Sequence, residues 1–220
     1  MKIHFFLILL SFNNFIGAQV LNSNSWDKNY FGVLFSPFAL VDFFQGPGIN
    51  LAFEYKIKLV DLQTNVNYHT DLFAFNVHKL SWEDISGVTL KQEVKYFPNG
   101  SEYYGFELNY GNQSYYWTDS VNNTQTYSPA DTTIRYKNYR QFIGLSVNFG
   151  TQKVYDNGLT LGFKLGVGAK FNSVSNQLSQ EDADRRMTGD WNNPANWIQK
   201  KGNHIIPKFN FGFYVGFSFR

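Results

Sequence analysis

Histidine and serine are the residue types in this chain that could carry nucleophilic chemistry. A Ser/His/acid set needs a histidine base within hydrogen-bond reach of the serine and an acid that orients the histidine. The candidates are His4, His69, His78 and His204 as bases, Ser173 and Ser175 as nucleophiles, and Asp71 and Glu83 as acids. No spacing ties a serine to one of these histidines, and no nucleophile elbow or Gly-rich phosphate loop is present. We therefore expect no catalytic residues and interpret the histidines as polar structural groups.

Metal and nucleic-acid chemistry have equally little support. Glu181, Asp182 and Asp184 have a spacing that is faintly like a calcium loop, but the Gly and the distal Glu of such a loop are missing. The chain has no cysteine, which excludes disulfides and thiolate metal sites. Its formal net charge of +2 is too small to indicate nucleic-acid binding. We expect no metal, no cofactor and no nucleic-acid partner.

The N-terminus has the pattern of a secretory signal peptide. Lys2 gives a positive start, residues 5–10 are apolar, and Gly17 and Ala18 offer a small-residue cleavage point. The apolar run is much shorter than the roughly 20 residues that a spanning helix needs. The sequence therefore predicts a signal peptide over residues 1–18, removed when the protein is exported.

Beyond this segment, the elements of the chain are strands, because apolar side chains recur at every second residue. The sequence has 23 Phe, 14 Tyr and 18 Gly but only 16% charged residues, which suits alternation of large apolar with small or polar side chains. In residues 159–171, for example, Leu, Phe, Val and Ala alternate with Thr, Gly and Lys. A strand separates these two sets onto opposite faces, whereas a helix would mix them. The pattern predicts eight strands, over residues 30–39, 48–57, 60–69, 88–97, 103–111, 141–149, 159–171 and 207–220.

Short and long connections between these strands alternate. Short joins fall at residues 55–60, 98–102 and 151–158, and long polar links at 70–87, 116–137 and 173–203. Only the first connection, around residues 43–48, is short where a long one is expected. Outer-membrane barrels have short periplasmic turns and longer external loops. We therefore predict an all-β fold, an eight-stranded antiparallel up-and-down transmembrane β-barrel.

The face of each strand that points inward decides between two kinds of barrel. A soluble, lipocalin-like periplasmic binder would enclose its apolar face, whereas a membrane barrel turns that face toward lipid. The polar faces are rich in Gly, which suits a narrow lumen, and carry charges of both signs that could pair across it. This predicted charge network comprises Glu54, Lys91, Glu93, Lys95, Glu107, Lys164, Lys170 and Lys208. Tyrosines near the strand ends resemble an aromatic girdle: Tyr30, Tyr55, Tyr68, Tyr96, Tyr104 and Tyr110. These features favour the membrane barrel.

The C-terminus carries a resemblance to a known signal. Residues 210–217, NFGFYVGF, look like the C-terminal signal read by the outer-membrane barrel assembly machinery. The matching positions are Asn210, Gly212, Val215 and Phe217, with Phe219 in phase, while the final Arg220 departs from the usual aromatic end. Residues 30–220 as a whole resemble small OmpA/OmpX-like barrels, and the middle is similar to poorly characterised barrels of the Bacteroidetes type. This resemblance implies fold and location but little about activity.

The sequence thus predicts a signal peptide over residues 1–18, a periplasmic segment over 19–29 and an outer-membrane barrel over 30–220. We expect a structural or interaction role with a plugged lumen, not a general porin. The expected partners are outer-membrane lipid, the assembly machinery during biogenesis, and proteins or glycans that meet the external loops. A lipid A-modifying hydrolase or acyltransferase is the alternative, since small lipid-modifying barrels carry a lipid-facing Ser/His/acid set.

Overall fold

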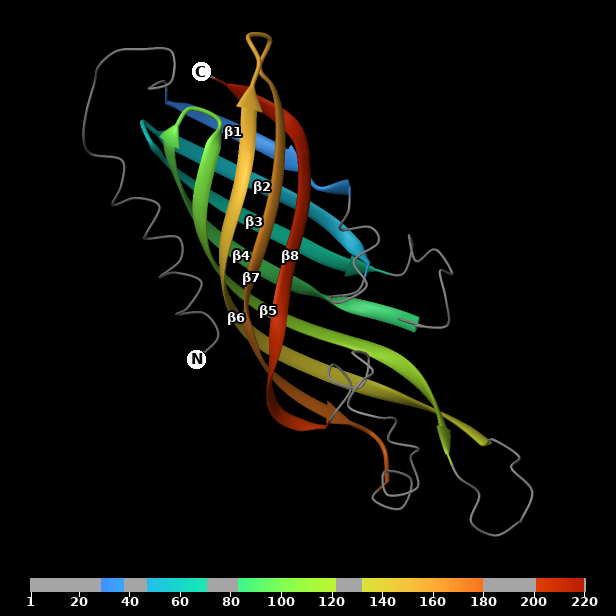
Figure 1. Cartoon of the computed structure of the whole chain (residues 1–220). Coiled ribbons are helices and arrows are strands. Elements are labelled where there is room, and N and C mark those ends of the chain that lie inside the picture. The colour runs from blue at the N-terminus through green and yellow to red at the C-terminus, as the bar shows by residue number, and fades with distance from the viewer. Residues whose placement is uncertain (1–28, 38–46, 71–82, 122–131, 180–200, 220) are drawn as a thin grey trace, which may run out of the picture.

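The chain folds as a closed barrel of eight antiparallel strands (Figure 1). The structure is a computed structural model, which describes residues 29–37, 47–70, 83–121, 132–179 and 201–219. The strands are β1 (Tyr30–Phe35), β2 (Gly48–Ile57), β3 (Val60–Thr70), β4 (Glu83–Asn99), β5 (Glu102–Val121), β6 (Thr132–Val154), β7 (Leu159–Asn176) and β8 (Gly202–Phe219). Each strand pairs with the next along the chain, and β1 pairs with β8 to close the ring. The predicted all-β, up-and-down topology is confirmed.

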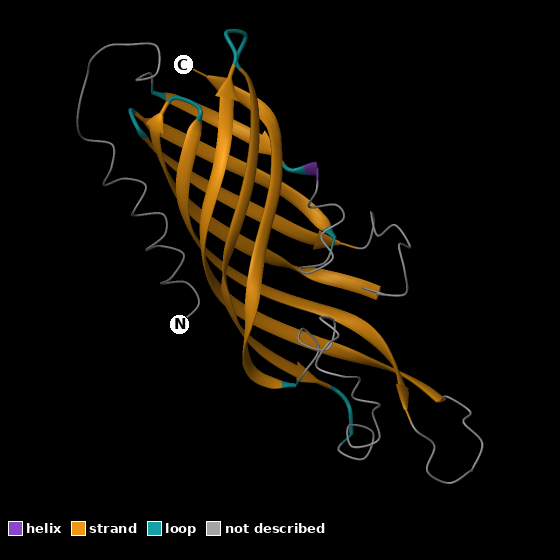
Figure 2. Ribbon diagram, viewed as in Figure 1, coloured by secondary structure: helices purple, strands orange, loops and turns teal. Residues whose placement is uncertain are grey.

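Alternation along the strands separates an inner from an outer face, as the sequence pattern predicts. On β7, Lys164 is 3% exposed and lies inside, while its neighbour Leu165 is 49% exposed and lies outside. The same parity runs through all eight strands, which Figure 2 shows as one continuous wall. Since successive side chains of a strand point to opposite faces, the register of each strand fixes which residues enter the lumen.

Three tight turns join strands at one end of the barrel, together with the start of β1 and the end of β8 (Figure 1). Two of them are two-residue turns, Lys58–Leu59 and Gly100–Ser101, in which Lys58 and Gly100 have φ of 54° and 79°. The third covers residues 155–158 and ends at Gly158, with φ of 84°. Left-handed φ values are typical of tight hairpin turns. These turns confirm the predicted short joins.

Strands β5 and β6 are much longer than the sequence pattern indicated. The predicted bounds of the link, residues 116–137, are wrong, since β5 continues to Val121 and β6 begins at Thr132, which leaves residues 122–131 between the two strands. In these extensions, aromatic side chains join polar ones on the inner face: Tyr115, Trp117 and Tyr136 pack inside with Ile85 and Ile206, on the same face as the buried Gln113 and Arg140. A prediction that requires polar side chains at inward positions and apolar ones outside therefore assigns these extensions to loops.

Strand β1 also departs from the simple pattern. It was predicted over residues 30–39, but it ends at Phe35, and Phe38 and Ala39 lie outside the described residues. Leu34, on the polar parity, is 1% exposed and packs with Ala52 and Tyr214 inside the barrel. Gly216 permits this contact, because a Cβ there would come within 2.8 Å of Leu34 Cδ2. At this point of the seam between β1 and β8, the inward side chains therefore form a small apolar cluster and not an ion pair or a hydrogen bond.

Candidate functional site

The lumen is lined with charged and amide side chains. Of the eight residues of the predicted charge network, seven are buried inward-facing residues: Glu54, Glu93, Lys95, Glu107, Lys164, Lys170 and Lys208. Lys91 also occupies an inward position on β4, between Asn65 of β3 and Asn109 of β5, but is only half-buried. It forms no ion pair with another described residue.

The centre of the lumen holds a four-residue ion-pair cluster. Lys164 Nζ of β7 lies 2.7 Å from Glu93 Oε2 of β4 and 2.6 Å from Glu107 Oε2 of β5. Lys208 Nζ of β8 lies 2.6 Å from Glu107 Oε1. The cations thus come from β7 and β8, and the carboxylates from β4 and β5. We name Glu93, Glu107, Lys164 and Lys208 the central cluster.

Neutral polar side chains complete the hydrogen bonding of the central cluster. Asn148 Nδ2 donates to Glu93 Oε1 over 2.6 Å, and Lys208 Nζ donates to Ser146 Oγ over 3.0 Å. Asn210 Nδ2 donates to Ser146 Oγ and to Asn148 Oδ1, both over 2.8 Å. Buried charges are tolerated when they are paired and hydrogen-bonded in this way.

A second cluster lies near the end of the barrel with the tight turns. Lys95 Nζ lies 3.4 Å from Glu54 Oε2 and 3.3 Å from Asp61 Oδ2, and it donates to Gln152 Oε1 over 2.8 Å. Gln152 Nε2 donates to Glu54 Oε1 over 3.0 Å and to the Tyr30 hydroxyl over 2.7 Å. These contacts connect β1, β2, β3, β4 and β6 across the lumen.

This second cluster contains residues that the sequence prediction missed or misplaced. Asp61 and Gln152 were absent from the predicted network, although Asp61 stands on the polar face of its strand and the alternation could have identified it. Tyr30 was predicted in an outer girdle, but it is 6% exposed and points inward. Tyr30 has the same parity on β1 as Gly32 and Leu34, so it faces inward with them. The prediction from its aromatic type gave the wrong face.

Aromatic rings lie beside the cations at the same end. Lys56 Nζ is 4.2 Å from the ring centroid of Phe97, and Lys95 Nζ is 5.2 Å from that of Tyr103. The rings of Phe97 and Tyr103 are themselves in contact, with centroids 5.2 Å apart. Both side chains are 2% exposed. Cation–π contacts of this kind are strongest where water is excluded.

The opposite half of the lumen, toward the long links, is dominated by amides. Arg140 Nε donates to Gln113 Oε1 over 3.0 Å, and Arg140 Nη2 donates to the same oxygen. Lys170 of the predicted network lies here, with Nζ 4.5 Å from the ring centroid of Phe142. Side chains of Asn50, Asn65, Asn67, Asn109 and Asn172 are also buried inside.

Among the described candidates, the structure places the histidines and the serines on opposite faces of the wall, with His204 on the inward parity of β8 opposite Asn172. His69 is fully buried in the lumen, where its Nε2 lies 2.8 Å from Thr89 Oγ1, as expected for a polar structural histidine. Ser173 and Ser175 are exposed on the outer face of β7. His4, Asp71, His78 and the acidic run Glu181, Asp182 and Asp184 lie outside the described residues, as does the side chain of Glu83. Within the described ranges, no group of three His, Asp or Glu side chains is placed to hold a metal ion.

The residues of the predicted assembly signal all lie on β8. Asn210 and Gly212 face the lumen, whereas Phe217 and Phe219 are 54% and 60% exposed on the outer face, with Val215 on the same side. Val215, Phe217 and Phe219 pair with Phe35, Val33 and Phe31 of β1. The C-terminal part of the predicted signal, from Val215 to Phe219, therefore lies on the seam that closes the barrel.

On the membrane location that the sequence predicts, replacing both Phe217 and Phe219 with serine should sharply lower the yield of inserted barrel, because the closing strand would lose its apolar outer face. The measurement is the folded fraction in membranes, read from the heat-dependent mobility of the protein on a gel. Replacing Ser173 and Ser175 on β7 with alanine is the control. A normal yield of the double Phe variant would refute an assembly role for these residues.

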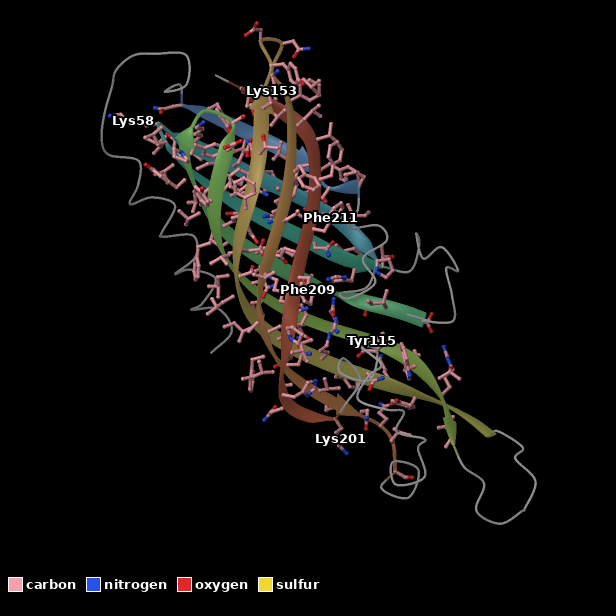
Figure 3. All side chains as sticks on the ribbon, in the orientation of Figure 1. Lys58, Tyr115, Lys153, Lys201, Phe209 and Phe211 are labelled. Carbon is pink, nitrogen blue, oxygen red and sulfur yellow. The ribbon has the colours of Figure 1, made fainter. Side chains whose placement is uncertain are left out.

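The outer face of the barrel forms an apolar belt. Its exposed members include Phe53, Tyr68, Phe106, Val147, Phe149, Leu165, Val167, Phe209, Phe211 and Phe217. Figure 3 shows Phe209 and Phe211 on β8, between Lys58 and Lys153 at the tight-turn end and Lys201 at the other. Toward the long links, the outward positions become polar at Asn112, Gln141 and Ser173. The belt is therefore bounded along the barrel axis.

Comparison with protein-family models, curated proteins and solved structures found no match. Among the residues that the structure describes, no helix is long and apolar enough to cross a membrane.

Proposed function

We propose that the chain is an integral outer-membrane barrel with a structural or interaction role and a lumen closed by ion pairs. The observation that carries the proposal is the inverted polarity of the fold: charges and amides are buried inside, and large apolar side chains cover the outside. Monomeric soluble proteins rarely expose contiguous apolar patches above a few hundred Å². In a lipid bilayer, the same surface is the favourable one.

On β7, the apolar belt is long enough for this proposal. Its outward residues are apolar from Leu159 to Phe171, a run of 13 residues, whereas the outward run on β6, from Ile143 to Phe149, has 7 residues. A tilted strand needs about 9–11 residues to cross the hydrocarbon core. Tyr96 and Tyr104, 50% and 60% exposed, lie near the tight-turn end of the belt, where aromatic girdles are found. A closed ring also has no edge strand, so no row of backbone N–H and C=O groups would lie unpaired in lipid.

The interior argues against a soluble, lipocalin-like binder. Such a barrel holds its ligand against apolar walls, whereas the inward positions around the central cluster carry Ser146, Asn148 and Asn210. The extensions of β5 and β6 beyond the belt support a role in contact with other molecules, since they project polar outer faces such as Asn112 and Gln141 past it. Contacts to proteins or glycans through the long links stay a prediction, because most of these links lie outside the described residues.

Fractionation of Gram-negative cells that produce the protein tests the proposal. We expect the protein in the outer-membrane fraction, extracted only by detergent. The Val147→Asp variant, which places a charge on the belt, should be recovered there in a smaller amount. Native protein that stays soluble without detergent would overturn the proposal.

The refolded protein should show no large, steady conductance in planar lipid bilayers. The central cluster and the second cluster, around Lys95, span the lumen at two levels, and an eight-stranded barrel has an interior that side chains just fill. A general porin measured in the same bilayers provides the positive control. Stable openings of porin size would contradict a closed lumen.

A further inference from the structure

Two polar side chains interrupt the apolar belt on the outer face of β3 and β4. The outward positions of these strands carry Leu62, which is only 8% exposed, Val66 and Tyr68 on β3, and Val88, Leu90, Val94 and Tyr96 on β4. Between them lie Thr64 and Gln92, which are register partners in the sheet. On the outer face, these two are flanked by Phe53 of β2 and Leu108 of β5. The pair thus stands in the middle of the belt, with apolar neighbours on every side.

The polarity of Gln92 is only partly satisfied within the barrel. Thr64 Oγ1 donates to Gln92 Oε1 over 2.8 Å, and Gln92 Nε2 donates to the carbonyl oxygen of Gln63 over 3.2 Å. A glutamine amide has two N–H donors and two acceptor sites on its oxygen. One donor and one acceptor site of Gln92 are left after these two bonds, on a side chain that is half-buried and faces outward. Lipid chains offer no partner to such groups, and polar groups at membrane depth are found where protein covers them.

We infer that the outer face of β3 and β4 is a self-association surface, on which Gln92 of one copy hydrogen-bonds Gln92 of a second copy. The inference rests on the proposed membrane location. An amide is self-complementary, because its donor and acceptor can pair with those of an identical amide across a two-fold axis, and two-fold interfaces are isologous. Side-chain hydrogen bonds between membrane-spanning elements act in this way as links between them.

The surrounding surface suits close approach of a second barrel. Its side chains near Gln92 are Thr64, Val66, Leu90 and Val94, which are small or aliphatic. The outer faces of β7 and β8 carry instead the bulky rings of Phe163, Phe209 and Phe211, and Phe163 and Phe211 stack edge to face at 5.3 Å. Side chains without large rings allow two barrels to come near each other, as small residues do at membrane interfaces. The β3–β4 face is therefore the side on which the half-buried amide of Gln92 can reach a partner.

Site-specific cross-linking tests the inference directly, because the chain has no native cysteine. Leu90→Cys and Val94→Cys, reconstituted in lipid vesicles and treated with a short bifunctional thiol reagent, should form covalent dimers. Val147→Cys, on the outer face of β6, is the matched control. It is 59% exposed, against 42% for Val94, so random collision would favour the control. Equal or greater cross-linking at Val147 would overturn the inference.

A second variant tests the role of the amide. Gln92→Leu should lower the dimer association constant about tenfold in detergent sedimentation, since two symmetric hydrogen bonds in a membrane sum to roughly that factor. Two outcomes would overturn the self-association surface: a Gln92→Leu protein that dimerises as strongly as the native protein, or a native protein that is only monomeric. Protease protection in the vesicles separates the two proposals: a barrel that inserts but stays monomeric refutes only this inference. A protein that fails to insert refutes the proposed function.

Discussion

Replacing Lys164 with methionine should destabilise the barrel by about 3–5 kcal/mol, the loss expected when one partner of a buried ion pair is removed. Lys164 faces two carboxylates, Glu93 and Glu107, at 2.7 and 2.6 Å in a part of the lumen where all three side chains are at most 4% exposed. Methionine keeps much of the side-chain volume but leaves two buried negative charges with one fewer cation. Urea unfolding in lipid vesicles, followed by tryptophan fluorescence, measures the change.

Two further variants show whether the loss comes from charge. Lys153→Met, at an exposed outward position near the tight turns, should change the free energy of unfolding by no more than about 0.5 kcal/mol. Adding Glu93→Gln to Lys164→Met should recover about 1 kcal/mol or more, because contacting residues are coupled and one uncompensated charge is removed. A Lys164→Met barrel as stable as the native one would show that the lumen is hydrated enough to tolerate unpaired carboxylates.

Replacing Val147 with arginine should cost about 2–4 kcal/mol in a lipid bilayer, the range for a basic residue near the midplane of a barrel surface. Val147 is 59% exposed on the outer face of β6, between Leu145 and Phe149. On a soluble protein, such an exposed substitution would change stability by no more than about 0.5 kcal/mol. The same urea titration in vesicles measures the difference, so this variant distinguishes a lipid-facing belt from a water-facing one.

Thr151→Arg is the matched control for Val147→Arg. Thr151 is also exposed and outward-facing on β6, but it lies four residues closer to the tight-turn end, beside Gln152 and Lys153. At the rim, a basic residue should cost only about 0–1 kcal/mol. Equal effects of the two arginines would mean that depth in the belt does not matter, and would argue against burial in lipid.

The strand order and the inner face of the barrel could be predicted because a period of two is a local property of the sequence. Lys164 and Glu107 each stand between apolar residues, so their inward direction follows from parity alone. The extensions of β5 and β6 could not be predicted in this way. There, Tyr115 and Tyr136 point inward on the same face as Gln113 and Arg140, so polar and apolar side chains no longer separate by face and the alternating pattern is lost.

The partners within the lumen depend on the stagger between strands, which no local pattern encodes. Glu107 and Lys208 are distant in the sequence, yet one row across the sheet runs from Glu107 to Ser146, Gly168 and Lys208. The two intermediate residues are small, so the long lysine side chain can reach over them to the carboxylate. Residue type predicted that these charges enter the lumen, but only the register shows which of them meet.

The seam between β1 and β8 has a consequence for the kinetics of folding. Every other pairing joins neighbouring strands in the chain, so seven of the eight ladders can form from local hairpins. The last ladder, from Phe31 with Phe219 to Phe35 with Val215, joins the two ends of the described chain and is short. Since non-local contacts incur the largest loop-closure entropy, formation of this ladder should limit the folding rate. A circular permutant opened at the Gly100–Ser101 turn, with β8 linked to β1, would make that ladder local and should fold faster.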